Sequence, residues 1–193
     1  NGALTRDTYQ VDMIQFYTIC GVGDTFDPSI TRAVGCPYAA LWDFGDGTTA
    51  VGDSVSKTTY TDAGPHLVTL YLPDAQKWLT TIDVNTDKIS GDFLATISKC
   101  TALTSIIANT NTAVTGDISS LSAMTGMTYL YLYDTAVTGD ISSLSAMTGM
   151  TVLYLNNTAV TGNISSLSAM TAMTVLYLSN TAVTGNISSL SAM

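Results

Sequence analysis

The second half of the chain repeats one pattern of apolar and polar positions. Thr-Gly pairs place glycine at Gly116, Gly139, Gly162 and Gly185, always 23 residues apart. The unit that begins at Met127 reads MTYLYLYDTAVTGDISSLSAMTG, and the two units after it differ at only a few positions. A fixed period of this length indicates a solenoid, in which short units stack and bury together a core that none could bury alone.

Each unit is expected to contain one short strand, which covers residues 129–133 in this copy. Side chains alternate across a strand, so Leu130 and Leu132 should point into the coil. Gly139 is expected at a sharp turn where a Cβ atom would clash. The repeated methionines occupy equivalent apolar positions, and we expect them to be core residues rather than metal ligands. These methionines are Met124, Met127, Met147, Met150, Met170, Met173 and Met193.

The pattern L-x-x-L-x-L-x-x-T-x-V-T-G-x-I-x-x-L-x-x-M resembles the leucine-rich repeat, L-x-x-L-x-L-x-x-N-x-L. The resemblance covers residues 79–193 in about five repeats of 23–25 residues, the first two of them irregular. Thr135, Thr158 and Thr181 stand where the family usually has Asn, and a threonine hydroxyl can donate to a backbone carbonyl. The T-G-x-I segment resembles a subclass found in plant receptors and bacterial surface proteins. The resemblance implies a solenoid with a parallel β-sheet on its concave face.

The first half has the pattern of a small β-sandwich. Alternating runs at residues 38–44 and 66–72 flank turns rich in Gly and Asp. The segment resembles the PKD domain, an immunoglobulin-like module of cell-surface proteins, through WDFGDG at 42–47, YTDAG at 60–64 and LVTL at 67–70. The residues before 38 match only loosely, through apolar alternation around Val11–Ile19.

We therefore expect a mainly β chain with two parts. A PKD-like β-sandwich with an N-terminal cap should span residues 1–77 and pack on a leucine-rich repeat solenoid over residues 78–193. Only residues 73–75 look like a break, so no flexible linker is expected. The first apolar layer of such an array needs cover, and we expect Trp78 and Leu79 in the seam.

Met193 occupies the same repeat position as Met170, so this sequence shows no divergent polar cap after the last repeat. Two expectations follow: further repeats continue the natural chain, or another molecule covers the last coil. An end-to-end contact through this uncapped C-terminal repeat is therefore one candidate interaction.

Charge narrows the classes of partner. The net charge is −9, every acid is Asp, and all six basic residues precede residue 100. This balance argues against a nucleic-acid partner, which needs a basic face. No apolar run approaches the roughly 20 residues of a membrane span, so an anchor outside this chain would supply any membrane contact. The chain starts at Asn1 rather than Met, which suggests a processed or shortened product without its targeting signal.

Catalytic chemistry is nearly absent from the sequence. It has no G-x-S-x-G motif, no phosphate loop and no His-rich metal pattern, and its single histidine, His66, is expected to be structural. Asp117 and Asp140 become Asn163 and Asn186 in later copies, which favours turn chemistry over acid–base catalysis. We expect no enzymatic activity, no cofactor and no metal site.

Two local alternatives remain open in the first half. Asp43 and Asp46 should cap a tight glycine turn, while a Ca²⁺ site with Asp53 or Asp62 is the alternative. The cysteines also leave a choice, because a Cys20–Cys36 disulfide is feasible in an exported protein. Cys100 occupies the position that Met124 has later, and we expect it to be a small buried apolar residue.

The outward positions of the strands are the candidate binding surface. Stacked strands would place equivalent residues about 4.8 Å apart, so Tyr131, Tyr154 and Tyr177 should form a column. Aromatic anchors with a polar rim give binding surfaces their energy and direction. The alternative is that tyrosine only favours strands and stabilises its neighbours. The candidate ligand-binding residues are Tyr129, Tyr131, Tyr133, Tyr154, Asn156, Tyr177, Asp134, Asn157 and Asn180.

These resemblances imply a non-enzymatic, cell-surface or secreted bacterial protein that serves in binding or adhesion. It would recognise an extracellular protein or host-surface ligand through the concave face. A glycan-binding accessory protein and a structural stalk without a ligand are the alternatives.

Overall fold

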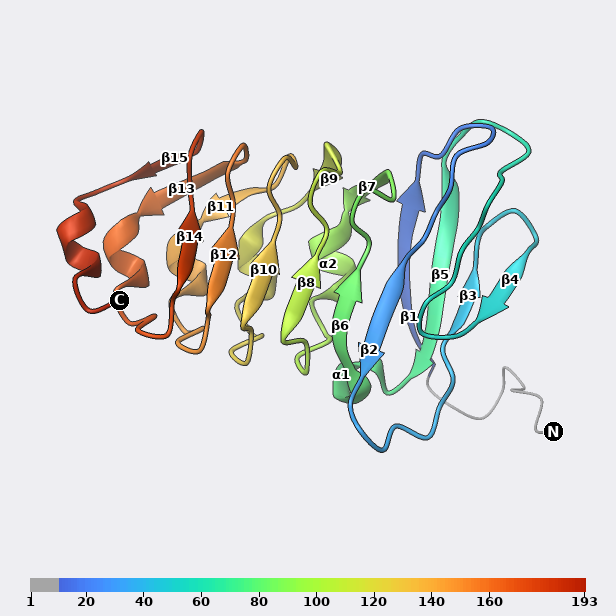
Figure 1. Ribbon diagram of the computed structural model, residues 1–193, viewed down its shortest axis with the longest axis horizontal. Helices are drawn as coiled ribbons and strands as arrows, with labels where there is room; N and C mark the ends of the chain where they lie inside the picture. Colours follow the sequence, from blue (N-terminus) through green and yellow to red (C-terminus); the bar gives the residue numbers. More distant parts are fainter. Residues whose placement is uncertain (1–10) are drawn as a thin grey trace.

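The computed structural model describes residues 11–193 and shows an elongated molecule. Strands of the sandwich lie at one end, and the coils stack away from them to the last coil (Figure 1). One continuous cluster of buried apolar side chains runs from Ile14 and Phe16 to Met170 and Met173. The expected combination of a PKD-like sandwich and a leucine-rich repeat solenoid is confirmed.

Five strands build most of the sandwich: β1 (Val11–Thr18), β2 (Ser29–Arg32), β3 (Leu41–Asp43), β4 (Thr49–Val51) and β5 (His66–Pro73). Trp42 and Phe44 are buried, as the alternation predicts, and Trp42 donates its indole N–H to the carbonyl of Gly52. Val68 shares their buried side, whereas the side chain of Leu67 is exposed. The expected runs are thus strands, although the first is shorter than residues 38–44.

Each coil of the solenoid contributes a strand to the concave sheet. These strands are β6 (Leu79–Asp83), β8 (Ser105–Ile107), β10 (Tyr129–Tyr131), β12 (Val152–Tyr154) and β14 (Val175–Tyr177). They pair in parallel and in the expected register, with Leu130 opposite Leu153 and Ile106. Leu130 and Leu132 are fully buried, and the strand ends at Tyr131 rather than at residue 133.

The other side of each coil carries a second strand and a helical turn. The strands are β7 (Ile89–Asp92), β9 (Ala113–Thr115), β11 (Thr138–Asp140), β13 (Ala159–Asn163) and β15 (Ala182–Thr184). The α-helices are α1 (Ala75–Trp78) and α2 (Phe93–Ile97). The 3-10 helices are η1 (Ile118–Leu121), η2 (Ile141–Leu144), η3 (Ile164–Leu167) and η4 (Ile187–Leu190).

The sandwich and the solenoid share two sheets, while a third sheet, β11-β13-β15, belongs to the solenoid alone. Strand β2 pairs antiparallel with β6 and extends the concave sheet, while β1 pairs with both β5 and β7. The resulting sheet orders are β14-β12-β10-β8-β6-β2 and β4-β3-β5-β1-β7-β9. Hydrogen-bonded strands, together with buried Leu79, therefore cover the first coil. Trp78 is half-buried in the seam, and its carbonyl accepts the N–H of Ala33.

We call the position at which the family usually has Asn the ladder position. The threonine at this position donates a hydrogen bond within its own coil. The Thr135 hydroxyl donates to the Leu132 carbonyl at 2.6 Å, and Thr158 does the same to Leu155. The expected donation to a backbone carbonyl is confirmed. Six of the seven repeat methionines are buried as expected, and Met193 is half-buried.

The structure bears on two of the open alternatives in the first half. Cys20 and Cys36 are not joined to each other, so the Cys20–Cys36 disulfide does not form. The carboxylate of Asp43 accepts the N–H of Gly45, and that of Asp46 accepts the N–H of Thr48. Both aspartates therefore cap the glycine turn.

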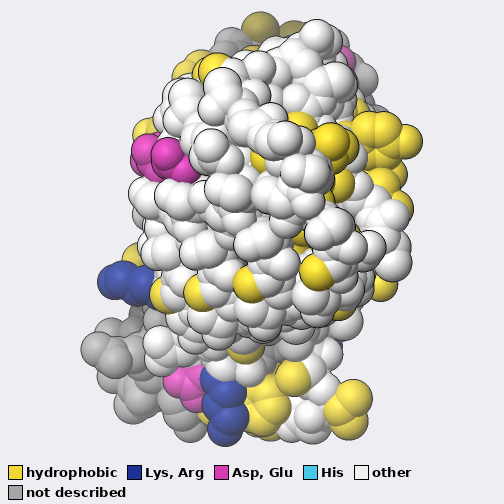
Figure 2. Space-filling model, turned by 90° about the vertical axis from the view of Figure 1, so that its left-hand side faces the viewer, with side chains coloured by type: hydrophobic (Ala, Val, Ile, Leu, Met, Phe, Trp, Pro, Cys, Tyr) yellow, Lys and Arg dark blue, Asp and Glu magenta, His cyan; other side chains and the backbone are white. Residues whose placement is uncertain are grey.

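The coil at the far end of the molecule is largely uncharged. Seen from that end, the surface is mostly polar and neutral, with apolar patches between (Figure 2). The Ile187 side chain is exposed, and Leu176 and Leu190 are only partly covered. Among residues 11–193, no helix has the length and apolar character needed to cross a membrane.

Candidate ligand-binding face

The outward residues of the concave sheet form three columns, which we call the concave face. The first column runs Asp83, Ile107, Tyr131, Tyr154, Tyr177, and the second runs Thr81, Ser105, Tyr129, Val152, Val175. The third column lies just after the strands: Asn85, Asn109, Tyr133, Asn156, Ser179. Backbone hydrogen bonds from Thr110 to Tyr133 and from Asp134 to Asn156 set its register. The face thus changes from polar residues near the sandwich to tyrosines in the later coils.

The tyrosines of the first column pack against one another edge to face. The ring centroids of Tyr131 and Tyr154 are 4.8 Å apart, and those of Tyr154 and Tyr177 are 4.7 Å apart. Tyr133 joins them, with its ring 6.0 Å from that of Tyr154. Such pairs stabilise each other beyond simple burial, so part of the stabilising role considered for these residues is real.

The tyrosines nevertheless keep their polar ends available. Among the described residues, none of the five hydroxyl groups on this face hydrogen-bonds to another protein group. The side chains of Tyr129 and Tyr177 are 44% and 52% exposed. Burial raises the pKa of Tyr131, and the neighbouring Tyr154 and Tyr129 add to the shift. The Tyr131 hydroxyl is therefore a neutral donor at physiological pH.

A shallow pocket opens between the first and third columns. It has a volume of about 350 Å³ and is lined by Tyr133, Tyr154, Asn156, Tyr177 and Ser179. Four of these five residues belong to the set predicted from the sequence. Aromatic surface with a few placed polar groups is typical of a recognition pocket.

A polar rim follows the third column. We define it as Thr86, Thr110, Asp134, Asn157 and Asn180, which all have a positive φ between 55° and 61°. Asn180 donates to the side-chain oxygen of Asn157 at 2.6 Å, and Asn157 donates to Asp134 Oδ1 at 2.5 Å. Asparagine and aspartate tolerate this left-handed conformation better than most residues. The rim is therefore an ordered chain of amides that ends on one carboxylate.

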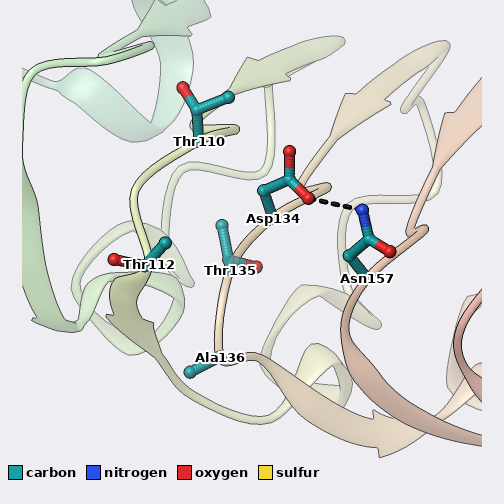
Figure 3. A pocket seen from close by; sticks show the side chains of 6 residues that line it. All are labelled: Thr110, Thr112, Asp134, Thr135, Ala136 and Asn157. Atoms are coloured by element: carbon teal, nitrogen blue, oxygen red, sulfur yellow. Dashed lines mark hydrogen bonds between the residues drawn. The ribbon is translucent and has the colours of Figure 1, made fainter.

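A second shallow pocket lies beside Asp134. Its volume is about 450 Å³, and its lining comes from the loops of three successive coils (Figure 3). The lining residues are Thr110, Thr112, Asp134, Thr135, Ala136 and Asn157. The structure therefore places all nine predicted residues on the concave face or its rim, next to two pockets.

The charged residues of the concave face and rim are all acidic. Within the described chain, the ion pairs are Arg32–Asp53, Lys57–Asp46, Lys88–Asp24 and the contact of His66 with Asp62, all in the first half. The concave face and rim contain only Asp83 and Asp134 as charged residues, and neither has a basic partner.

His66 and Asp46, which the sequence also singled out, are held by contacts within the sandwich. The His66 ring is buried and stacks on Tyr60 at 4.1 Å. Burial alone would raise the pKa of Asp46, but hydrogen bonds from Lys57 and Thr48 outweigh it and lower that pKa to about 2. Among residues 11–193, no three His, Cys, Asp or Glu side chains gather closely enough to hold a metal ion.

One buried acid was not anticipated from the sequence. Asp87 is only 4% exposed, its Oδ1 accepts the N–H of Asp27 at 2.8 Å, and its Oδ2 is buried without a hydrogen-bond partner. Burial raises its pKa to about 7. Asp87 occupies the ladder position that Asn111 has in the next coil, and alignment of the irregular first unit with the later copies could have identified it.

Comparisons with known proteins agree with this architecture. Residues 11–88 match the PKD domain family, so the match continues past residue 77 and includes β6. No curated protein matches the chain.

Several plant receptor ectodomains have similar structures. The BIR3–SERK2 complex from Arabidopsis thaliana has a TM-score of 0.50 and 21% identity, over 55% of this chain and 58% of that one. The ectodomain of the receptor kinase SOBIR1 from the same plant has a TM-score of 0.48 and 16% identity, over 67% and 65% of the two chains. The leucine-rich repeat ectodomain of GASSHO1/SCHENGEN3 has a TM-score of 0.44 and 26% identity, over 49% of this chain and 12% of that one. The chain thus spans less than two thirds of the length of each of these three neighbours. A PKD-type β-sandwich therefore continues into a leucine-rich repeat solenoid in this chain.

Proposed function

We propose that this chain is a non-enzymatic, cell-surface or secreted binding module that recognises an extracellular protein or peptide through its concave face. The observation that carries the proposal is the cluster of five tyrosines on this face: four of their rings pack against one another, and none of the five hydroxyls has a hydrogen-bond partner among residues 11–193. Ordered aromatic side chains lose little conformational entropy on binding, and their free hydroxyls can pair with a ligand.

The geometry of the face favours an elongated ligand. The columns are in register across five coils, and the last three coils present tyrosines of the first column at steps of about 4.8 Å. A segment that lies across the strands could contact Tyr131, Tyr154 and Tyr177 in turn. The amide groups of the rim would then meet the backbone of that segment from one side.

The shared fold supports this proposal only in general terms. The BIR3–SERK2 structure is a complex of two proteins, but the likeness concerns the fold. The argument for binding therefore rests on the tyrosines and the rim of this chain.

Selection of a random peptide display library on the intact chain would test the proposal. Selected peptides should lose at least tenfold in affinity for the Tyr177→Ala variant, because truncating an exposed aromatic anchor removes contact area at the face. Tyr17→Ala is a matched control, because Tyr17 is 48% exposed on the sandwich and Tyr177 is 52% exposed on the concave face. Melting curves of both variants would check that the fold is retained.

Three results would contradict the proposal. Peptides that bind both variants equally would place recognition elsewhere on the molecule. A glycan array that gives Tyr177-dependent binding while the peptide library gives none would favour glycan capture. Failure of both screens would favour the stalk interpretation.

A further inference from the structure

The concave face and its rim carry negative charge without any compensating base. Asp83 lies on β6 near the sandwich, and Asp134 lies on the rim after β10. Both side chains are half-buried, and neither forms an ion pair with any residue of the described range 11–193. The nearest basic residues in sequence, Lys77 and Lys88, lie outside the columns and the rim.

The hydrogen bonds around Asp134 leave one of its oxygens free. Oδ1 accepts from Asn157, which in turn accepts from Asn180, so the amide donors of the rim all point toward this carboxylate. The other oxygen points away from Asn157 at the edge of the pocket (Figure 3). Asp83 is similar, because its Oδ1 accepts the N–H of Asn85 and its Oδ2 accepts no hydrogen bond from the part of the chain that the structure describes.

The tyrosines of the later coils add to the preference of this face for a cation. Electron-rich faces of tyrosine rings attract ammonium and guanidinium groups within about 6 Å of the ring centre. A carboxylate beside such rings can form a charge-assisted hydrogen bond with the same group. The net charge of −9 also steers basic ligands toward the molecule.

We propose that the segment recognised by the concave face is basic, with lysine or arginine side chains that pair with Asp83 and Asp134. This inference rests on the proposed function and specifies its ligand. Asp83 and Asp134 are two strands apart, about 10 Å, and offset by up to three residues along the strand, so roughly 13 Å separates them. An extended peptide spans that distance in about four residues. Two basic residues at positions i and i+4 lie on the same side of such a peptide and fit the two carboxylates.

A pair of double variants separates local recognition from net charge. Asp83→Asn/Asp134→Asn removes the two charges of the face and keeps the oxygens that accept from Asn85 and Asn157. Asp117→Asn/Asp140→Asn removes two charges on the other side of the coils, where later copies already carry Asn163 and Asn186. Both variants change the net charge by the same amount, and melting curves would establish that both keep the fold.

The readout is the affinity of peptides selected on the intact chain, measured at low and high salt. We expect the selected peptides to be enriched in Lys and Arg with a spacing of four. They should bind the Asp83→Asn/Asp134→Asn variant about tenfold more weakly and the Asp117→Asn/Asp140→Asn variant within twofold. The salt dependence should shrink only in the first variant, because screening acts on the charges that contact the ligand.

Other results would overturn the inference. Peptides that require Tyr177 but show no excess of Lys and Arg, and bind the face variant normally, would reject a basic ligand and leave the proposed function standing. Equal losses in the two double variants would show that net charge alone attracts the peptides. Selected peptides that bind independently of Tyr177 would reject both the basic ligand and the proposed face.

Discussion

The carboxylate of Asp117 occupies the space into which a Cβ atom on Gly139 would project. A Cβ built on Gly139 would lie 2.8 Å from Asp117 Cγ, and the glycine has a φ of 109°. The same contact links Asp140 with Gly162, and Asn163 fills the space at Gly185. Each of these acids or amides also accepts a backbone N–H at the start of its 3-10 helix, as Asp117 does from Ser119. One side chain thus caps its own coil and fills the turn of the next, which explains why both Asp and Asn occur at this position.

Gly139→Ala should destabilise the protein by about 2–4 kcal/mol. The substitution combines a strained positive φ with a clash against Asp117 in a tightly packed turn. Urea unfolding followed by circular dichroism would measure the loss in free energy of unfolding.

Gly149→Ala is the control for this prediction. No atom lies within 4 Å of a Cβ built on Gly149, and the next coil already has Ala172 at the equivalent position. We expect a change within about 0.5 kcal/mol for this exposed site. Equal effects of the two substitutions would show that the contact with Asp117 does not constrain Gly139.

The regular coils could be predicted from sequence because their chemistry recurs. Leu130 and Leu132 recur in the two later copies and Gly139 recurs in three others, so a single register accounts for the core and the turn. The columns of the concave face follow from the same register, since equivalent residues must stack. The edge-to-face contacts of the Tyr154 ring with the rings of Tyr131 and Tyr177 could not be predicted, because ring orientation depends on contacts between coils.

Asp87 shows where such prediction stops. Its unit is irregular, so the ladder position falls in a polar stretch that looks like an exposed turn. The N–H that it binds belongs to Asp27, 60 residues earlier in the chain. Pairings of this range, like that of β2 with β6, depend on tertiary structure that a single sequence does not display.

Asp87→Asn should stabilise the protein above neutral pH. The folded-state pKa of Asp87 is about 7, raised from 3.8 by burial. The folded state therefore holds a proton that the unfolded state loses, and stability falls as pH rises from about 4 to about 7. Asparagine keeps the acceptor for Asp27 and supplies a donor, as Asn111 does toward Val84 in the next coil. We expect a gain on the order of 2–3 kcal/mol at pH 8.

Thermal unfolding at several pH values would test this prediction. The difference between the variant and the parent should be small near pH 4 and largest above pH 7. A difference that does not vary with pH would show that the Asp87 carboxyl does not titrate in this range. Asp53→Asn, at a half-exposed position paired with Arg32, is a control that should not reproduce this pattern.

Thr158→Val should cost about 1 kcal/mol. Valine has nearly the same shape as threonine but cannot donate to the Leu155 carbonyl, to which the hydroxyl now lies at 2.6 Å. The net contribution of one buried hydrogen bond is about 0.5–1.5 kcal/mol. Thr161→Val is a comparison on the exposed side, where the hydroxyl contact to Gly139 is 3.4 Å long. If Thr158→Val were neutral, packing alone would explain the ladder of threonines.

Phe93→Ala should weaken the whole molecule rather than one part of it. Phe93 is fully buried on α2, and its ring lies 5.6 Å from that of Phe16 on β1, so the pair joins the sandwich to the solenoid. Loss of a buried phenylalanine costs about 3–5 kcal/mol. Because two shared sheets and one core connect the parts, we expect a single cooperative transition that moves to lower temperature in this variant. Leu167→Ala, far from the seam but equally buried, should lower the same transition. Differential scanning calorimetry would measure the transitions. If the parent showed two transitions and each variant shifted only one of them, the two parts would not share a single core.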